Sequence, residues 1–297
     1  MGEHIYYALK NIKWECCTCG LPNFSSSLFN NTVFETSNTF SYLSQSTGAS
    51  EADISFNHPN ATSSPTKVEH KRNDLPLRIL VINCQSIKTP GKNAELANVI
   101  ESTQADIVIG TESWLKPAIK SLEVFPSNFK CYRKDRESRE GGGVFLIISD
   151  KYESEEPEQL KVDQECKLMW AKIKVQGSKD LYIGSLYRPP DETNPQYLEI
   201  LESYLAKIPT NKGAHLWLGG DFNLPGIDWI DESIKPDATH KTTCGQLLEI
   251  SKNASLDQLV TEPTRITETH SSILDLLFTN NDTLVKLNTD NPRHLRP

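Results

Sequence analysis

The sequence predicts an α/β domain of about 220 residues with a single core, beginning near Pro76. Between residues 77 and 112, an apolar β-branched run precedes a stretch with helical spacing, Lys92 to Thr103, which precedes a second apolar run. A strand, a helix and a strand at this spacing form a βαβ unit, so the two strands should be parallel. Further apolar runs alternate with helical stretches along the rest of the chain, which is why one α/β core is expected.

The remaining strands and helices are predicted from the same two periodicities. The basic stretch from Lys130 to Arg139 is interpreted as a loop, and two helices are expected over 194–208 and 243–254. The alternating run 169–175 should be a half-exposed strand. The other strands should cover residues 144–148, 181–187, 214–218 and 272–279.

Composition narrows the class of protein. The formal charge of 31 − 39 = −8 argues against a broad, non-specific nucleic-acid surface but permits a local basic rim. The first residues lack a signal-peptide pattern, and no apolar run is long enough to span a bilayer. Seven cysteines, most of them scattered, are typical of reduced thiols rather than of a disulfide framework. An intracellular protein without a membrane segment is expected.

The N-terminal residues differ in character from the domain. Cys16 and Cys19, with Trp14 ahead of them, have the spacing of a zinc half-site, and residues 1–20 resemble the tail of a PHD-type zinc finger. A second ligand pair is not found nearby, so a complete zinc site is not expected. Eleven serines lie between Leu21 and Thr66, and residues 21–73 are predicted to be a disordered Ser/Asn-rich linker.

The stretch from Gly219 to Trp229 carries the most chemistry. A buried strand ends at two glycines, and Asp221 and Asn223 follow two residues apart, so that both side chains point the same way. A carboxylate can take a proton from water, and a carboxamide can donate to a phosphoryl oxygen. A strand-end turn would use the same two residue types for backbone reasons. Both interpretations remain open for this stretch taken alone.

Other predicted strands also contain or end in polar groups. Asn83, Glu112 and Tyr187 follow or close their strands, and Asp275 interrupts the last apolar run. Each has an ordinary structural explanation, such as a cap, a surface carboxylate or a core phenol. Their joint occurrence is not expected from packing, and open α/β sheets place their sites at strand ends.

These residues, in this order, resemble the endonuclease/exonuclease/phosphatase superfamily. The resemblance rests on Asn83, Thr111 to Trp114, Ser185 to Pro190, Gly219 to Asn223 and Ser272 to Asp275. Within the superfamily, the sequence is similar to the apurinic-type endonuclease domain of LINE-type (non-LTR, jockey-like) retrotransposons. Residues 74–281 should form this domain, which the resemblance implies is a four-layer sandwich of two mixed β-sheets flanked by helices.

The resemblance also implies roles for individual residues. Glu112, with Asn83 beside it, would ligate a divalent cation, Mg²⁺ or Mn²⁺, and Asp221 would orient or deprotonate the attacking water. Asn223 and Tyr187 would hold the phosphate, and Asp275 would be a supporting acid. The basic residues Arg188, Arg133 and Arg136 could contact DNA phosphates, although a solvated basic loop is an equally good interpretation of the last two.

One element of the superfamily pattern is absent from this sequence. The family closes its site with a Ser-Asp-His triplet on the last strand. Residues 282–297 lack this triplet: their single histidine, His294, has no Asp before it and lies between Pro292 and Pro297. The C-terminal strand is therefore expected to be missing, with an irregular tail in its place. Phosphodiester cleavage should then be severely impaired.

Three functions follow from the pattern. The first is a metal-dependent DNA endonuclease of a retrotransposon-derived protein, which nicks one strand to give a 3′-OH, with a reverse transcriptase domain as its partner and the nucleus as its compartment. The second is a phosphomonoesterase or RNase of the same fold. The third is a non-catalytic relic that binds DNA or protein. The strings Ser185 to Pro190 and Gly219 to Trp229 favour the first.

Overall fold

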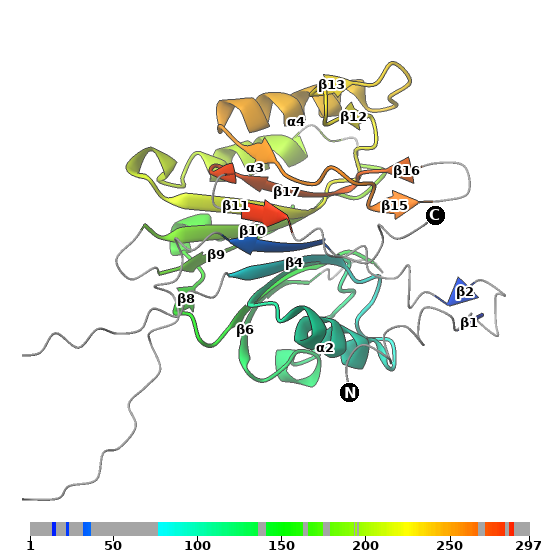
Figure 1. Cartoon of the computed structure of the whole chain (residues 1–297), viewed down its shortest axis with the longest axis vertical. Coiled ribbons are helices and arrows are strands. Elements are labelled where there is room, and N and C mark those ends of the chain that lie inside the picture. The colour runs from blue at the N-terminus through cyan, green and yellow to red at the C-terminus, as the bar shows by residue number, and fades with distance from the viewer. Residues whose placement is uncertain are drawn as a thin grey trace, which may run out of the picture.

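The computed structural model describes residues 77–135, 141–162, 166–174, 179–192, 194, 196–266 and 271–282. It also describes the backbone of four short strands at 14–15, 22–23, 32–36 and 285–287. Two six-stranded sheets pack face to face, and helices cover their outer faces (Figure 1). The four-layer mixed α/β sandwich expected from the sequence is confirmed. Cys16, Cys19 and Arg136 lie outside the described residues.

The first sheet has the strand order β18-β3-β4-β5-β7-β6. Its two central strands, β4 and β5, are parallel as predicted, and the other pairs are antiparallel. β-branched and other apolar residues fill β4, β5 and β7, since these strands are covered on both faces. The strands are β3 (Thr32–Thr36), β4 (Arg78–Asn83), β5 (Ile107–Thr111), β6 (Phe129–Lys134), β7 (Val144–Ser149) and β18 (Val285–Leu287).

The second sheet has the strand order β14-β17-β11-β10-β9-β8. Here β10 and β11 are the parallel pair, and β17 runs antiparallel to β11. The strands are β8 (Ser154–Glu155), β9 (Lys167–Ile173), β10 (Leu181–Tyr187), β11 (His215–Asp221), β14 (Asp257–Gln258) and β17 (Asp275–Thr279). Three two-stranded pairs complete the strands: β1 (Trp14–Glu15) with β2 (Pro22–Asn23), β12 (Ile227–Asp228) with β13 (Ser233–Ile234), and β15 (Arg265–Ile266) with β16 (Ser271–Ser272).

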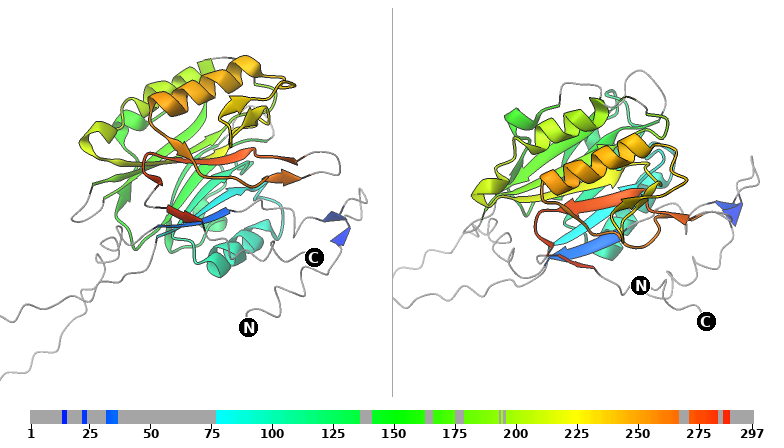
Figure 2. Two further views of the ribbon diagram at one scale, coloured as in Figure 1. Left: turned by 45° about the horizontal axis from the view of Figure 1, so that its top comes forward. Right: turned by 90° about the horizontal axis from the view of Figure 1, so that it is seen from above.

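Three α-helices cover the sheets. Helix α2 (Lys92–Thr103) packs Leu96 and Ile100 on the first sheet, and α3 (Gln196–Leu205) and α4 (Lys241–Asn253) lie side by side on the second (Figure 2). Short 3-10 helices occur at Ser121–Glu123, Glu158–Leu160 and Thr210–Lys212. None of the helices in the described part of the chain combines the length and the apolar character needed to cross a lipid bilayer.

The middle layer of the core lies between the two sheets. It is built from the inward-facing residues of both, among them Ile109, Leu146, Ile183 and Trp217. A hydrogen bond of 3.0 Å from Ser185 Oγ to the carbonyl oxygen of Gly110 also joins the sheets. This close packing fixes the two sheets against each other, so polar groups at one edge of each sheet hold fixed relative positions.

The strand directions bring polar groups to one edge of the sandwich. Asn83 and Thr111 are register partners at the carboxyl ends of the parallel strands β4 and β5. In the second sheet, Tyr187 at the end of β10 pairs with Asp221 at the end of β11, which pairs with Asp275 at the start of β17. The β15–β16 hairpin leads into β17 at this edge (Figure 1). The edge is called the polar edge below.

Some sequence-based predictions differ from the structure. The expected loop over Lys130 to Arg139 is a strand, β6, up to Lys134. This strand pairs with β7, and its apolar residues pack on the core between the first sheet and helix α2. The expected linker 21–73 contributes β3 to the first sheet, and the expected irregular tail 282–297 contributes β18, which pairs with it. The predicted half-exposed strand is largely buried as β9, since β10 and the first sheet cover it.

Removing residues 1–73 should destabilise the protein more than removing residues 1–30. The longer deletion removes β3 and leaves the N–H and C=O groups along one side of β4 without their strand partner. Thermal unfolding and light scattering of the two truncated proteins measure the difference. We expect a lower melting temperature and more aggregation for the chain that lacks residues 1–73, and equal stability would contradict the pairing of β3 with β4.

Candidate active site at the polar edge

Asp221 occupies the centre of the polar edge and is linked to both sheets. Its side chain is 5% exposed, and its Oδ2 accepts a hydrogen bond of 2.9 Å from Asn83 Nδ2 in the opposite sheet. Its Oδ1 accepts a hydrogen bond of 3.1 Å from the backbone N–H of Asn223. Burial, followed by the charges of Asp275 and Glu112, raises the pKa of Asp221 well above its usual range. Two donors thus hold a buried carboxyl group in a single orientation.

The glycine before Asp221 is required by the close approach of β10. Gly220 has φ +135°, and a Cβ atom there would lie 2.0 Å from the carbonyl oxygen of Leu186. A side chain cannot be accommodated against a backbone atom at this distance without moving one of the strands. The lack of a side chain at Gly220 therefore permits the close approach of β10 and β11.

Asp275 faces Asp221 from the neighbouring strand. It is 7% exposed, and its backbone N–H donates to Thr264 Oγ1 at 3.1 Å. Its Oδ1 is buried and has no hydrogen-bond partner among the described residues. Burial raises the pKa of Asp275 to about 7, against a smaller lowering by the Thr264 hydroxyl. Two buried carboxyl groups on adjacent strands therefore favour holding protons in the folded protein.

Glu112 begins the loop that follows β5, and its backbone is in the left-handed region at φ +53°. Its Oε2 accepts hydrogen bonds from Trp114 Nε1 at 2.5 Å and from the backbone N–H of Gly142 at 2.8 Å. Left-handed backbone at a non-glycine residue costs free energy and persists only where the surroundings hold it. The surroundings here are the glycine run, since the Trp114 N–H donates to the Gly142 carbonyl oxygen at 2.9 Å.

Asn223 and Arg188 hold the two strand ends together. Asn223 Nδ2 donates to the carbonyl oxygen of Arg188 at 2.8 Å, and Arg188 NH1 donates to the carbonyl oxygen of Asn223 at 3.2 Å. Arg188 is 0% exposed, and its guanidinium also donates to the carbonyl oxygens of Pro189 and Glu192. The predicted contact of Arg188 with DNA phosphates is therefore not supported, because its donors are turned inward to backbone oxygens.

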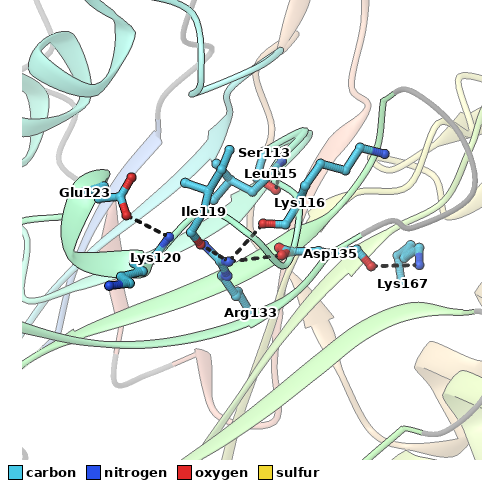
Figure 3. Close-up of polar contacts among 9 residues, drawn as sticks. All are labelled: Ser113, Leu115, Lys116, Ile119, Lys120, Glu123, Arg133, Asp135 and Lys167. Atoms are coloured by element: carbon cyan, nitrogen blue, oxygen red, sulfur yellow. Dashed lines mark hydrogen bonds and ion pairs between the residues drawn. The ribbon is translucent and has the colours of Figure 1, made fainter.

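Arg133 has a similar internal role. Its guanidinium donates to the carbonyl oxygens of Lys116 and Ile119 and forms an ion pair of 3.1 Å with Asp135 (Figure 3). The side chain is only 13% exposed. Arg133 thus fastens the loop after Glu112 to the end of β6, and the predicted DNA contact is not supported for this residue either. Both corrections have the same cause, since sequence does not show that a basic side chain is enclosed by carbonyl oxygens.

Tyr187 stands beside Asp221 in the same row of the second sheet. Its ring packs in the core between the sheets at 5% exposure, and its carbonyl oxygen accepts a hydrogen bond from the Tyr197 hydroxyl. The structure therefore brings together five residues singled out from the sequence, and Glu112 lies near enough for its charge to affect Asp221. The five are Asn83, Tyr187, Asp221, Asn223 and Asp275.

Three further residues contribute to the site and were not predicted. Trp114 and Gly142 donate to Glu112, and Thr264 holds the backbone of Asp275. The signal for Trp114 was its position two residues after Glu112, and the signal for Gly142 was its place in a run of three glycines. Thr264 carried no distinguishing signal, because it lies 11 residues from Asp275 and meets it only in the folded chain.

The donor atoms at the polar edge fit a hard divalent cation. No Lys or Arg of the described residues forms an ion pair with Glu112, Asp221 or Asp275, so this part of the chain supplies these carboxyl groups with no cation. The described residues also contain no group of three or more His, Cys, Asp or Glu that could hold a metal ion by themselves. Mg²⁺ is usually bound by few carboxylates together with water and phosphate oxygens, and the few carboxyl and amide groups of the polar edge fit this mode of binding.

One family model matches the C-terminal part of this chain. Residues 181–295 match the family model described as Endonuclease-reverse transcriptase. The match includes Tyr187, Asp221, Asn223 and Asp275, whereas Asn83 and Glu112 precede it. A comparison with curated proteins found no match.

Solved structures show the same fold. The endonuclease domain of TRAS1, a telomere-specific non-LTR retrotransposon, superposes with a TM-score of 0.52 at 18% identity, over 69% of this chain and 84% of that one. The catalytic domain of Xenopus laevis APE2 superposes with a TM-score of 0.50 at 13% identity, over 69% and 82%. The resemblance to the endonuclease/exonuclease/phosphatase superfamily, predicted from the sequence, is confirmed by the family model and the fold.

Replacing Asp275 by Asn should flatten the pH dependence of stability. An ordinary aspartate has a pKa of about 3.9, whereas that of Asp275 is raised to about 7 when folded. Between these values the folded state binds more protons than the unfolded state, so stability falls as pH rises through this window. Asp275→Asn keeps the uncharged form at every pH and should lose less stability as the pH rises from about 4 to about 7.

Denaturant unfolding in EDTA across this window measures the effect. Asp106→Asn is the control, because Asp106 is also buried but lies at the start of β5, away from the polar edge, and accepts from the Arg78 N–H. Its variant should keep the pH dependence of the natural chain. An unchanged slope in Asp275→Asn would contradict the assignment.

Gly220→Ala should destabilise the protein far more than Gly91→Ala. Both glycines have positive φ, +135° and +89°, but a Cβ at Gly91 meets nothing within 4 Å, whereas one at Gly220 meets Leu186. We expect an additional loss of at least about 2 kcal/mol at Gly220, from strand displacement added to backbone strain. Chemical denaturation of both variants gives the difference, and equal losses would show that β10 and β11 are not this close.

Proposed function

We propose, from the match to the Endonuclease-reverse transcriptase model and from the shared fold, that this chain is a divalent-metal-dependent DNA endonuclease domain of a retrotransposon-type protein. It hydrolyses one phosphodiester bond and leaves a 3′-OH. The hydrogen bond between Asn83 and Asp221 is the observation that supports this most strongly. It joins the end of one sheet to the end of the other, and it brings an amide to the buried Asp221 carboxyl group, whose strand partner is Asp275.

The residues of the polar edge have distinct tasks in this proposal. Asp221, held by Asn83 and by the Asn223 N–H, orients the attacking water and takes its proton. Asp275 supports Asp221 from the adjacent strand. Tyr187 borders the position of the phosphate, and Asn223 keeps Arg188 and its turn in place. Orientation by neighbours that are themselves packed supplies the precision that phosphoryl transfer needs.

Glu112 and Asn83 would hold the divalent cation, Mg²⁺ or Mn²⁺. When bound, such a cation supplies Lewis-acid stabilisation of the phosphate and its leaving oxygen. Glu112 is suited to this because its second carboxylate oxygen, Oε1, accepts no hydrogen bond from the described residues.

We further propose that cleavage by this chain is slow. The described residues contain two histidines, His215 and His240, and neither lies at the polar edge. His215 begins β11, at the opposite end from Asp221, and His240 immediately precedes α4. The site thus has no imidazole from these residues to donate a proton to the scissile phosphate. The proposed slow rate rests on the lack of such a donor among the described residues.

The proposed substrate is duplex DNA, and the proposed partner is a reverse transcriptase that extends the new 3′-OH in the nucleus. The net charge of −8 and the enclosure of Arg133 and Arg188 predict weak, short-range contact with the DNA backbone. Binding should therefore depend on the site itself and on the bound metal more than on a broad basic surface.

A plasmid-nicking assay tests the proposal. Supercoiled DNA is incubated with Mg²⁺ or Mn²⁺ and the natural chain, Asp221→Asn, Glu112→Gln or the control Asp106→Asn. The natural chain should convert supercoiled to open-circular DNA slowly, and the two site variants should lower the rate by roughly 100-fold or more. Asp106→Asn should retain the natural rate, because Asp106 lies at the other end of β5.

Each failure has a separate meaning. Nicking that survives Asp221→Asn would refute the site. Turnover of a soluble phosphomonoester without DNA nicking would change the substrate class. Metal-dependent DNA binding without nicking at any enzyme concentration would make the chain a binding module instead of an enzyme.

A further inference from the structure

The carboxylate of Glu112 is held by two N–H donors that converge on one of its oxygens. Trp114 Nε1 lies 2.5 Å from Oε2, and the backbone N–H of Gly142 lies 2.8 Å from the same atom. Oε1 receives no hydrogen bond from the described residues. The two oxygens of Glu112 are therefore not equivalent, since one is occupied by protein donors and the other is left to a ligand.

We propose that Trp114 is a positioning residue that presents Glu112 Oε1 to the divalent cation. The inference rests on the proposed function, because it assigns to Trp114 a task at the same metal site. Two donors on Oε2 fix the side-chain rotamer, so that Oε1 is held where a cation can reach it. Nothing in the family comparison assigns this role, since the match begins at residue 181.

The backbone around Trp114 is shaped to place the indole there. Glu112 and Trp114 both have left-handed backbone, with φ +53° and φ +55°. Hydrogen bonds hold the loop on two sides. On one side, the N–H groups of Ser86 and Ile87 donate to carbonyl oxygens of the loop at 2.8 Å and 3.0 Å. On the other side, the backbone N–H of Trp114 donates to the carbonyl oxygen of Gly142. Two strained residues, separated only by Ser113, persist because these bonds over-determine the loop.

The glycine run provides the second half of the clamp. Gly142 has φ +71° and uses its N–H for Glu112 and its C=O for the Trp114 N–H. A Cβ on Gly141 would lie 3.7 Å from Trp114 Nε1 and 3.8 Å from Glu112 Oε2, so the run passes directly over the hydrogen-bonded pair. The reciprocal bonds couple the indole, the carboxylate and the glycine backbone into one unit.

A purely packing role for Trp114 makes a different prediction. If the ring served only to fill space, phenylalanine would replace it with a small loss of stability and no specific effect on the metal. If its N–H positions Glu112, removal of that N–H weakens metal binding even where the fold is intact. Metal affinity therefore separates the two roles, and unfolding temperature alone does not.

The test compares three variants with the natural chain. Trp114→Phe removes the donor, Glu112→Gln removes the carboxylate, and Trp229→Phe is the matched control. Trp229 is also a partly buried indole, packed on Phe278, but its Nε1 has no hydrogen-bond partner among the described residues. A fourth protein, with the Trp114 indole replaced by benzothiophene, retains the ring size and removes only the N–H.

Mn²⁺ binding is measured by electron paramagnetic resonance and by calorimetry, without DNA. Trp114→Phe and the benzothiophene protein should bind Mn²⁺ roughly 10- to 100-fold more weakly, the usual cost of losing a partner of a metal ligand. Trp229→Phe should bind as the natural chain does. In the nicking assay, raising the Mn²⁺ concentration should recover the rate of Trp114→Phe but not that of Glu112→Gln.

The outcomes distinguish this inference from the proposed function. If the natural chain binds Mn²⁺ and Glu112→Gln does not, the metal site stands, and unchanged affinity in the benzothiophene protein would then refute the role of Trp114 alone. If the natural chain shows no Glu112-dependent Mn²⁺ binding, the metal site and the inference are both overturned. If Trp114→Phe fails to fold, the benzothiophene protein decides the question.

Discussion

Asp221 and Asp275 face each other on adjacent strands, and Asn83 reaches Asp221 from the opposite sheet. These contacts require both sheets to be in register and packed at a fixed separation. Two buried carboxyl groups in such a position oppose folding unless they hold protons or bind a cation, because burial penalises each charge and the charge of Asp275 also raises the pKa of Asp221. The apolar layer between the sheets offsets this cost.

Stability and chemistry therefore compete at the polar edge. Asp275 Oδ1 has no partner among the described residues, and Glu112 and Trp114 have left-handed backbone, so free energy is stored where the proposed reaction takes place. Left-handed backbone also occurs away from the site, at Gln104, Glu232 and Ser255. Strain at residues that hold a site in place is expected where the site must be held ready for a ligand.

The basic residues near the site are used mainly for internal bracing. Arg188 holds the ends of β10 and β11 through carbonyl oxygens, and Arg133 fastens the loop after Glu112 to β6. A guanidinium has five N–H donors in a fixed plane, which suits it to joining several carbonyl oxygens at once. The same property makes arginine a common phosphate ligand, so residue type alone did not distinguish the two uses.

The sequence by itself determined the α/β class, the parallel pair β4 and β5, the extent of α2 and the strand-end positions of Asn83 and Asp221. Local periodicity encodes these features, since it depends only on residues near one another in the chain. The tertiary structure decided that β3 and β18 join the first sheet, that Arg133 and Arg188 are enclosed, and that Trp114, Gly142 and Thr264 support the acids. Apart from the bond of Trp114 to Glu112, which joins residues two apart in the chain, these features depend on contacts between distant segments, which no local pattern specifies.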